Sequence, residues 1–188
     1  MSPRPPGNLL KLYRGLSPAL WNLTGTAAAF DAKLARGVQG RQGLMDRLAT
    51  RAAEVRGGVW FHVTSVGEYE QARPIIKAIG ARDGAPPVAV THFSPSGYDY
   101  AHKQPTAAVH DYLPFDHPSD MEKLVRLWQP RLLVFVKFDC WPNQVLAADQ
   151  AGVPLVLLAG SLQPGSARLK PLARKLYRDI FDRFAHLG

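Results

Sequence analysis

The chain has 188 residues, of which 46% are hydrophobic and 20% are charged, with 16 glycines, 16 prolines and one cysteine. This length is sufficient for one globular domain with a substantial core. A single cysteine excludes a disulfide framework and a cysteine-based zinc finger. Basic side chains outnumber acidic ones by nine to three in residues 1–56 and by six to two in residues 165–188, whereas residues 57–164 hold eight against ten. The basic flanks indicate contact with an anionic partner or, alternatively, ordinary solvated helix faces.

Residues 1–56 are predicted to form a helical, basic lead-in to the main domain. Within them, the fifteen residues from Leu16 to Phe30 carry no charge. A helix that crosses a membrane needs about 20 apolar residues. Because Pro18 and several polar side chains dilute this short run, a spanning helix is disfavoured. We expect a helix that lies at a membrane surface, with Trp21 on its apolar side and basic side chains at the headgroups. The alternative is an ordinary helix packed on the domain.

From Gly57 onward, short apolar runs alternate with segments of helical periodicity. The runs predict strands at Gly58–Thr64, Pro87–His92, Ala108–Leu113, Arg131–Val136 and Pro154–Ala159. The other segments predict helices at Glu68–Ile79, Ser96–Lys103, Ser119–Trp128, Trp141–Ala151 and Ala167–Phe184. This alternation is typical of βαβ units, and runs that are apolar on both faces are typical of central parallel strands. We therefore predict an α/β fold, with a Rossmann-like, doubly wound parallel sheet of about five strands in residues 57–188.

In a sheet of this type, ligands bind beyond the carboxyl ends of the strands. The expected site therefore lies in the loops at residues 64–68, 92–97, 113–118, 137–143 and 160–168. The sequence contains no glycine-rich dinucleotide fingerprint, P-loop or nucleophile elbow, and its histidines, cysteine and carboxylates lack metal-ligand spacing. We expect neither a cofactor nor a metal ion. The lack of RNA-binding and DNA-binding motifs also disfavours nucleic acid as a partner.

The first of these loops contains a candidate general base. Glu68 begins a predicted helix, and Gly67 before it lets the backbone pass close to a ligand. Ser65 and Glu68 are also spaced as a capping box, in which each side chain binds the other residue's backbone N–H. The two interpretations are compatible, because a helix amino terminus keeps a carboxylate ionised and such a carboxylate can act as a base.

The next two loops offer hydroxyl groups and a carboxylate. Ser94, Ser96 and Gly97 open a predicted helix, where hydroxyl and N–H groups suit an anion or a sugar hydroxyl. Simple N-capping by one of the serines is the alternative. Asp116 follows a predicted strand and either faces the ligand or forms a turn before Pro118.

The fourth loop follows the most apolar of the predicted strands. It places Asp139 and Trp141 at the strand end, although a tryptophan is by default a core residue. Pro142 fits the first turn of the next helix. Cys140 is a lone thiol with no histidine or second cysteine nearby in the sequence, and we interpret it as a small packing residue.

Together, these motifs resemble the amino-terminal domain of the 3-deoxy-D-manno-octulosonic acid (Kdo) transferases, in order and spacing, over about Leu9–Leu187. The resemblance is carried by WFHVTSVGE at Trp60–Glu68, SPSG at Ser94–Gly97, YLPFD at Tyr112–Asp116, QPRLLVF at Gln129–Phe135, WPN at Trp141–Asn143 and SAR at Ser166–Arg168. It adds Asn143 and Arg168 to the candidate substrate-binding residues.

The resemblance implies one half of a two-domain glycosyltransferase of the GT-B type. Members of the family move Kdo from CMP-Kdo onto a lipid A precursor, without a metal, at the cytoplasmic face of the inner membrane. Their amino-terminal domain holds the acceptor and their carboxyl-terminal domain binds the CMP-sugar, so we expect the donor domain to be absent from this chain. The family's proposed base carries over to Glu68, which would deprotonate the acceptor hydroxyl. The basic lead-in would meet anionic lipid.

Three stretches depart from the family pattern, and one of them is Val90–Phe93, which replaces a threonine-rich strand end. Lys137 and Phe138 stand where members carry an acid and a threonine, and Asp139 keeps a shortened carboxylate. Ala159–Leu162 replaces a stretch that contains an arginine in the family. These changes favour an alternative, in which the chain is a non-catalytic, truncated relic or a domain that binds anionic lipid at the membrane surface.

Overall fold

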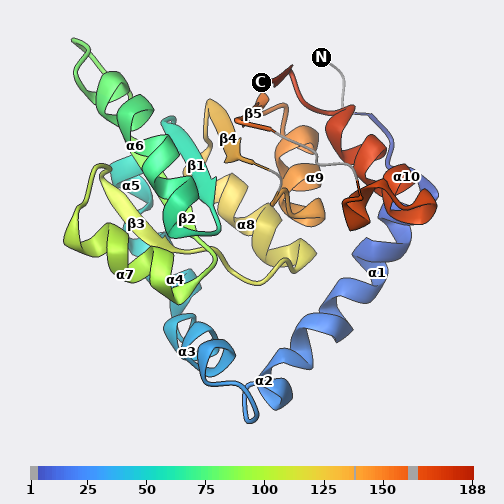
Figure 1. Ribbon diagram of the computed structural model, residues 1–188. Coiled ribbons are helices and arrows are strands. Elements are labelled where there is room, and N and C mark those ends of the chain that lie inside the picture. Colours follow the sequence, from blue (N-terminus) through green and yellow to red (C-terminus); the bar gives the residue numbers. More distant parts are fainter. Residues whose placement is uncertain (1–3, 138, 161–164) are drawn as a thin grey trace.

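A computed structural model describes residues 4–137, 139–160 and 165–188 and has an α/β fold (Figure 1). The described strands form one wholly parallel sheet, in the order β3-β2-β1-β4-β5-β6. They are β1 (Val59–Val63), β2 (Val88–His92), β3 (Val109–Tyr112), β4 (Leu132–Val136), β5 (Leu155–Leu158) and β6 (His186–Leu187). The predicted Rossmann-like, doubly wound parallel sheet is confirmed, and the short edge strand β6 is added to the five predicted strands.

Helices cover both faces of the sheet. Successive residues of a strand point to opposite sides, and here the apolar side chains on both sides are buried. The helices that follow the strands are α6 (Val66–Gly80), α7 (Pro95–Lys103), α8 (Pro118–Trp128), α9 (Pro142–Gln150) and α10 (Pro171–Phe181). Trp60 and Phe135 pack with α8 and α9 on one face, whereas Phe61 and Val134 pack with α6 and α7 on the other. Neighbouring residues of one strand thus enter two separate core clusters.

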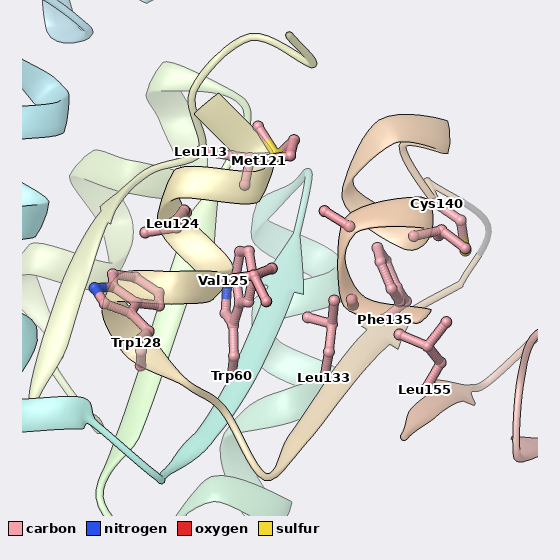
Figure 2. Close-up of a cluster of buried hydrophobic side chains, with 14 of the residues drawn as sticks. Trp60, Leu113, Met121, Leu124, Val125, Trp128, Leu133, Phe135, Cys140 and Leu155 are labelled. Atoms are coloured by element: carbon pink, nitrogen blue, oxygen red, sulfur yellow. The ribbon is translucent and has the colours of Figure 1, made fainter. Parts of the chain in front are cut away.

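The larger core cluster lies beneath α8 and α9 (Figure 2). Trp60 and Trp128 meet edge to face within it, with ring centroids 5.3 Å apart. The indole N–H of Trp60 donates to Thr91 Oγ1 at 2.8 Å, so this buried polar atom is satisfied. Cys140 packs into the same cluster, which confirms its predicted role as a small packing residue.

The lead-in packs on the same core as the sheet. It consists of α1 (Asn8–Asn22), α2 (Thr24–Ala27), α3 (Ala32–Gly40), α4 (Leu44–Thr50) and α5 (Ala52–Val55). Leu10 of α1 and Leu44 and Leu48 of α4 are buried in the larger cluster. In Figure 1, α1 runs from α10 to α2, and α3 returns towards the sheet. The uncharged run is divided among α1, α2 and the turn before α3, and no helix of the described residues is long and apolar enough to cross a membrane.

The prediction of one helix over Ala167–Phe184 is wrong. A short 3₁₀ turn, η1 (Ala167–Leu169), comes first, and Lys170 is extended with φ −61° and ψ 146° before α10 begins at Pro171. A proline disfavours the helical conformation of the residue before it, so the break falls at Lys170. Helix α10 then ends at Phe181, which leaves the chain free to form β6.

A buried arginine joins the two ends of the described chain. The guanidinium of Arg183 is fully buried, and it forms ion pairs with Asp149 of α9 and Asp179 of α10. It also donates to the carbonyl oxygens of Arg4 and Pro5, at 2.8 and 3.3 Å. The segment that leads into α1 is therefore held to the end of α10 by this side chain, together with the contacts of Arg4 with Asp182 and of the Gly7 N–H with Asp179.

We expect Arg183→Met to lower the free energy of unfolding by about 3–5 kcal/mol, because it leaves two partly buried carboxylates without their cation. Urea unfolding followed by circular dichroism measures this loss. The matched control is Arg4→Met, since Arg4 forms an exposed ion pair with Asp182 that should contribute about 1 kcal/mol or less. Equal losses in the two variants would contradict a stabilising role of the buried network.

Candidate functional site

The candidate site lies where the direction of winding changes at the carboxyl edge of the sheet. Strands β1 and β4 are neighbours, yet α6 follows β1 on one face and α9 follows β4 on the other. The two connections diverge there, and a switch point of this kind is where doubly wound sheets bind ligands in a crevice. The loops at residues 64–68 and 137–143 border it.

Glu68 is held at this crevice by the first turn of α6. The Glu68 N–H donates to Ser65 Oγ at 3.3 Å, and the Glu68 carboxylate accepts the Thr64 N–H at 2.5 Å. Ser65 is thus the N-cap of α6, and the carboxylate reaches back to the residue before it, in a variant of the expected capping box. A Cβ at Gly67 would meet no described atom within 4 Å, so the first turn is open beside Glu68.

The surroundings of Glu68 favour uptake of a proton. The residue is only 7% exposed, and this burial raises the pKa of its carboxyl group. The hydrogen bond from Thr64 opposes the rise, and the negative charge of Asp139 adds to it. A carboxylate whose pKa is raised and whose position is fixed by the backbone is suited to general-base chemistry.

Asp139 and Arg168, both predicted to bind substrate, contact each other. The Arg168 guanidinium donates to Asp139 Oδ1 at 2.8 Å and lies over the ring of Tyr177, 5.5 Å from its centre. Asp139 lies between the end of β4 and the start of α9, and Arg168 lies in η1. The two predicted ligands therefore form one ion pair beside the crevice.

The backbone at the ends of β4 and β5 is strained. Lys137 and Ala159 directly follow these strands and have φ values of 61° and 54°, in the left-handed region that non-glycine residues rarely adopt. Both belong to the stretches that depart from the family pattern. The other departures at Phe138, Ser161 and Leu162 lie outside the described residues.

The serine-rich loop brings a second helix terminus to the same edge. Ser94 is the N-cap of α7 and accepts the Gly97 N–H at 3.1 Å, and its hydroxyl lies 3.3 Å from that of Ser96. A Cβ on Gly97 would lie 3.5 Å from the carbonyl carbon of Ser65, in ordinary van der Waals contact, so α7 begins close to the start of α6. Ser94 therefore caps α7, as the alternative interpretation predicts, and this cap lies close to the start of the helix that carries Glu68.

Asp116 and Asn143 are buried inside the protein. The Asp116 carboxylate accepts the N–H groups of Asn143 and Gln144 at 3.0 Å, which caps α9, and it accepts the Tyr13 hydroxyl at 2.9 Å. Burial raises the pKa of Asp116 to about 6. The Asn143 amide donates to Ser17 Oγ at 2.9 Å. These contacts join α1 to α9, so both side chains serve the scaffold in this structure.

Trp141 is fixed as a wall of the site by a histidine. Its indole N–H donates to His62 Nε2 at 3.1 Å, and His62 Nδ1 lies 3.0 Å from Thr91 Oγ1. Because an indole nitrogen only donates, Nε2 must accept, which assigns the proton of His62 to Nδ1. Burial agrees with this neutral form, since it lowers the pKa of His62 to about 3. The half-buried Trp141 ring stacks on Phe93, with centroids 4.5 Å apart.

A pocket of about 380 Å³ opens between α3 and the ends of β1 and β2. Its lining includes Thr64 and Ser94 from the loops, and it is otherwise mostly apolar or basic: Asp31, Lys33, Leu34, Gly37, Arg41, Phe93, Pro95 and Phe115. Because Thr64 also binds the Glu68 carboxylate, the pocket adjoins the candidate base. The sequence did not point to this pocket, since α3 belongs to the lead-in.

Arg41 builds one wall of this pocket. Its guanidinium donates to the carbonyl oxygens of Leu113, Gly37 and Phe93 at 2.7–2.9 Å. It also lies over three aromatic rings, including Phe115 at 4.5 Å and Phe93 at 4.9 Å. Arg41 therefore fastens the end of α3 to the loops after β2 and β3. A basic residue in a helix of the lead-in gave no sequence signal for this role.

The structure thus brings most of the predicted site residues together and places two of them elsewhere. The residues at the crevice or the adjoining pocket are Ser65, Gly67, Glu68, Ser94, Ser96, Gly97, Asp139, Trp141 and Arg168. Asp116 and Asn143 lie behind them, beneath α1. Among the described residues, no group of three histidines, cysteines or carboxylates could hold a metal ion.

Comparison with known proteins agrees with these motifs. A family model described as 3-deoxy-D-manno-octulosonic-acid transferase (kdotransferase) matches residues 36–188. The 3-deoxy-D-manno-octulosonic acid transferase of Bordetella pertussis is 28% identical over 167 residues, which cover 82% of this chain and 37% of that protein. The transferase of the same name from Chlamydophila psittaci is 31% identical over 125 residues, which cover 65% of this chain and 29% of that protein. This chain thus spans about a third of the length of the curated relatives it matches. Because the family model matches most of its length, the chain belongs to the Kdo transferase family.

Proposed function

We propose that this chain is the acceptor-binding part of a glycosyltransferase that transfers Kdo from CMP-Kdo to a lipid A precursor in lipopolysaccharide biosynthesis. The observation that carries the proposal is the position of Glu68 in this chain, which belongs to the Kdo transferase family. This carboxylate is buried, held by the backbone at the crevice of the sheet, and adjoined by an open pocket. In this proposal the protein is a two-part GT-B enzyme, and a separate unit that faces this edge of the sheet binds CMP-Kdo.

In the proposed reaction, Glu68 takes the proton from an acceptor hydroxyl as that oxygen attacks the anomeric carbon of Kdo. The new bond joins this oxygen to the anomeric carbon, and the bond from that carbon to the phosphate oxygen of CMP breaks. CMP leaves with the electron pair, and the proton remains on Glu68. The raised pKa of Glu68 suits this step, because general bases work best when their pKa lies near the working pH.

The pocket beside Glu68 is suited to hold the acceptor. Ser94 offers a hydroxyl group to a sugar, and Lys33 offers a positive charge to an anionic substituent. Trp141, held by His62, presents an aromatic face near the same edge. A sugar ring that stacks on such a face and hydrogen-bonds to the serine loop would bring a hydroxyl towards Glu68.

A lipid acceptor also requires the protein to meet the membrane, and α1 offers a surface for this contact. Four leucines that follow one side of α1 and its end are each more than half exposed: Leu12, Leu16, Leu20 and Leu23. Phe30, 90% exposed, lies between α2 and α3, and Lys11 and Lys33 are nearby exposed cations. Apolar side chains flanked by basic ones are typical of helices that bind anionic lipid surfaces. We place the protein on the cytoplasmic face of the inner membrane.

This surface also supports the second candidate function, in which the chain binds anionic lipid without catalysis. Lys137 at a strained position and the ion pair that occupies Asp139 favour this alternative. The two functions differ in one respect that can be measured, which is whether Glu68 takes part in turnover.

Glu68→Gln should lower kcat by about 10²–10⁴, because the amide cannot accept the proton. The assay is the transfer of Kdo from CMP-Kdo to lipid A precursor by a protein that contains this chain together with its donor-binding unit. Glu70→Gln is the matched control, because Glu70 lies on the same helix and is exposed, where it pairs with Arg73. Normal turnover by Glu68→Gln would refute the base assignment. No turnover by the unaltered protein, with lipid binding retained, would support the non-catalytic alternative.

The pair of changes Leu16→Asp and Leu20→Asp should weaken binding to anionic vesicles at least about tenfold, since it removes two apolar side chains from the lipid contact. Flotation with phosphatidylglycerol vesicles, compared with phosphatidylcholine vesicles, measures this binding. Leu187→Asp is the control, because Leu187 is similarly exposed but lies on β6. Unchanged binding of the double variant, or equal binding to both kinds of vesicle, would count against the proposed surface.

A further inference from the structure

Two carboxylates lie in the loops that follow the neighbouring strands β1 and β4, although the proposed reaction needs only one proton acceptor. Glu68 follows β1 and Asp139 follows β4, and the two strands are direct neighbours with Phe61 opposite Val134. Their negative charges act on each other, since Asp139 contributes to the raised pKa of Glu68. Something in the site must therefore decide which of the two carboxylates is left to take up the proton.

The partners of the two carboxylates differ. Asp139 accepts a charged hydrogen bond from Arg168 at 2.8 Å. Glu68 instead accepts a neutral backbone N–H, that of Thr64. Charge-assisted hydrogen bonds are about twice as strong as neutral ones, so the side chain of Asp139 is held more firmly than that of Glu68.

Arg168 is itself held in place from several sides. Its backbone N–H donates to Ser166 Oγ at 3.3 Å, which fixes the start of η1. Its guanidinium lies over the ring of Tyr177 on α10. The side chains of Arg168 and Asp139 are each one-third exposed, so solvent screens the pair only in part. The Cys140 thiol is the other titratable group that Asp139, Arg168 and Glu68 jointly affect, and burial keeps it protonated by raising its pKa.

We propose that Arg168 is a positioning residue, whose ion pair with Asp139 holds that carboxylate in place and offsets its charge, so that Glu68 alone is left to receive the proton of the acceptor. Arg168 touches neither Glu68 nor the reacting atoms in this scheme and acts through Asp139. The inference rests on the proposed role of Glu68 as base. In this inference Asp139 and Arg168 do not bind the substrate directly. Glu68 takes up the proton, and Asp139 stays paired with Arg168.

The test is a titration of the Glu68 side chain by carbon-13 NMR of the carboxyl groups, on the chain as it stands. Arg168→Gln should raise the pKa of Glu68 by about one unit, because the charge of Asp139 is no longer offset. Asp139→Asn should lower the pKa of Glu68. In the Asp139→Asn background, Arg168→Gln should shift the pKa of Glu68 by less than half as much, because Arg168 then has no carboxylate to hold.

The controls separate this role from general effects of charge and folding. Arg168→Lys keeps the charge and should restore most of the unaltered value for Glu68. Arg126→Gln removes an equal charge from α8, where Arg126 pairs with Glu122, and should leave Glu68 unchanged. If Arg168→Gln fails to fold, Arg168→Met takes its place in both backgrounds, with the same shifts expected.

Two results would overturn the inference. Equal shifts on removing Arg168 with and without Asp139 would mean that Arg168 acts directly through its own charge. An unchanged Glu68 titration in Asp139→Asn would mean that the two carboxylates are independent. Because these titrations need no donor, acceptor or turnover, they can fail while the Glu68 base assignment stands, and they can succeed if the chain is not catalytic.

Discussion

The site depends on one constraint, which is that β1 lies at the centre of a wholly parallel sheet. Parallel strands deliver all their carboxyl ends to one edge, and the helices after β1 and β4 leave this edge on opposite faces. The first turn of α6 must then stand over the crevice. Glu68 lies in this turn and, because its carboxylate accepts the N–H of Thr64, it has little freedom to move away.

Polar side chains at this edge divide into those that build the scaffold and those that face the opening. Burying a polar group is costly unless it is hydrogen-bonded, and three of the deeply placed side chains here have several partners. Asp116 caps α9, His62 joins Trp141 to Thr91, and Arg41 is surrounded by three carbonyl groups and three rings. These contacts leave Glu68 and the serine loop beside the pocket, with the half-buried ring of Trp141 stacked on Phe93. The buried, hydrogen-bonded side chains thus fix the positions of the few polar side chains that face the opening.

Local signals in the sequence were sufficient where neighbours along the chain decide the structure. The strands follow from continuous apolar runs, and the start of α6 follows from the spacing of Ser65 and Glu68. The last helix differs from its prediction because the pattern of apolar residues continues through Lys170, whereas Pro171 disfavours the helical conformation of that residue.

The parts of the site that could not be predicted from the sequence depend on contacts between residues that are far apart in the chain. The burial of Asp116 depends on Tyr13, which is 103 positions away, and the pocket wall depends on contacts of Arg41 with residues 52 and 72 positions away. The ion pair between Asp139 and Arg168 likewise joins two loops that the family motifs present as separate. Only the folded chain shows that two residues expected to bind a substrate bind each other.

The most direct measurement is a crystal structure of the chain with the sugar headgroup of a lipid A precursor bound. If Glu68 is the base, a sugar hydroxyl should lie within roughly 2.6–3.2 Å of its carboxylate. The sugar should also occupy the pocket lined by Ser94 and Lys33. A headgroup bound at another face, with the Glu68 carboxylate turned away from every sugar hydroxyl, would contradict the proposed acceptor site.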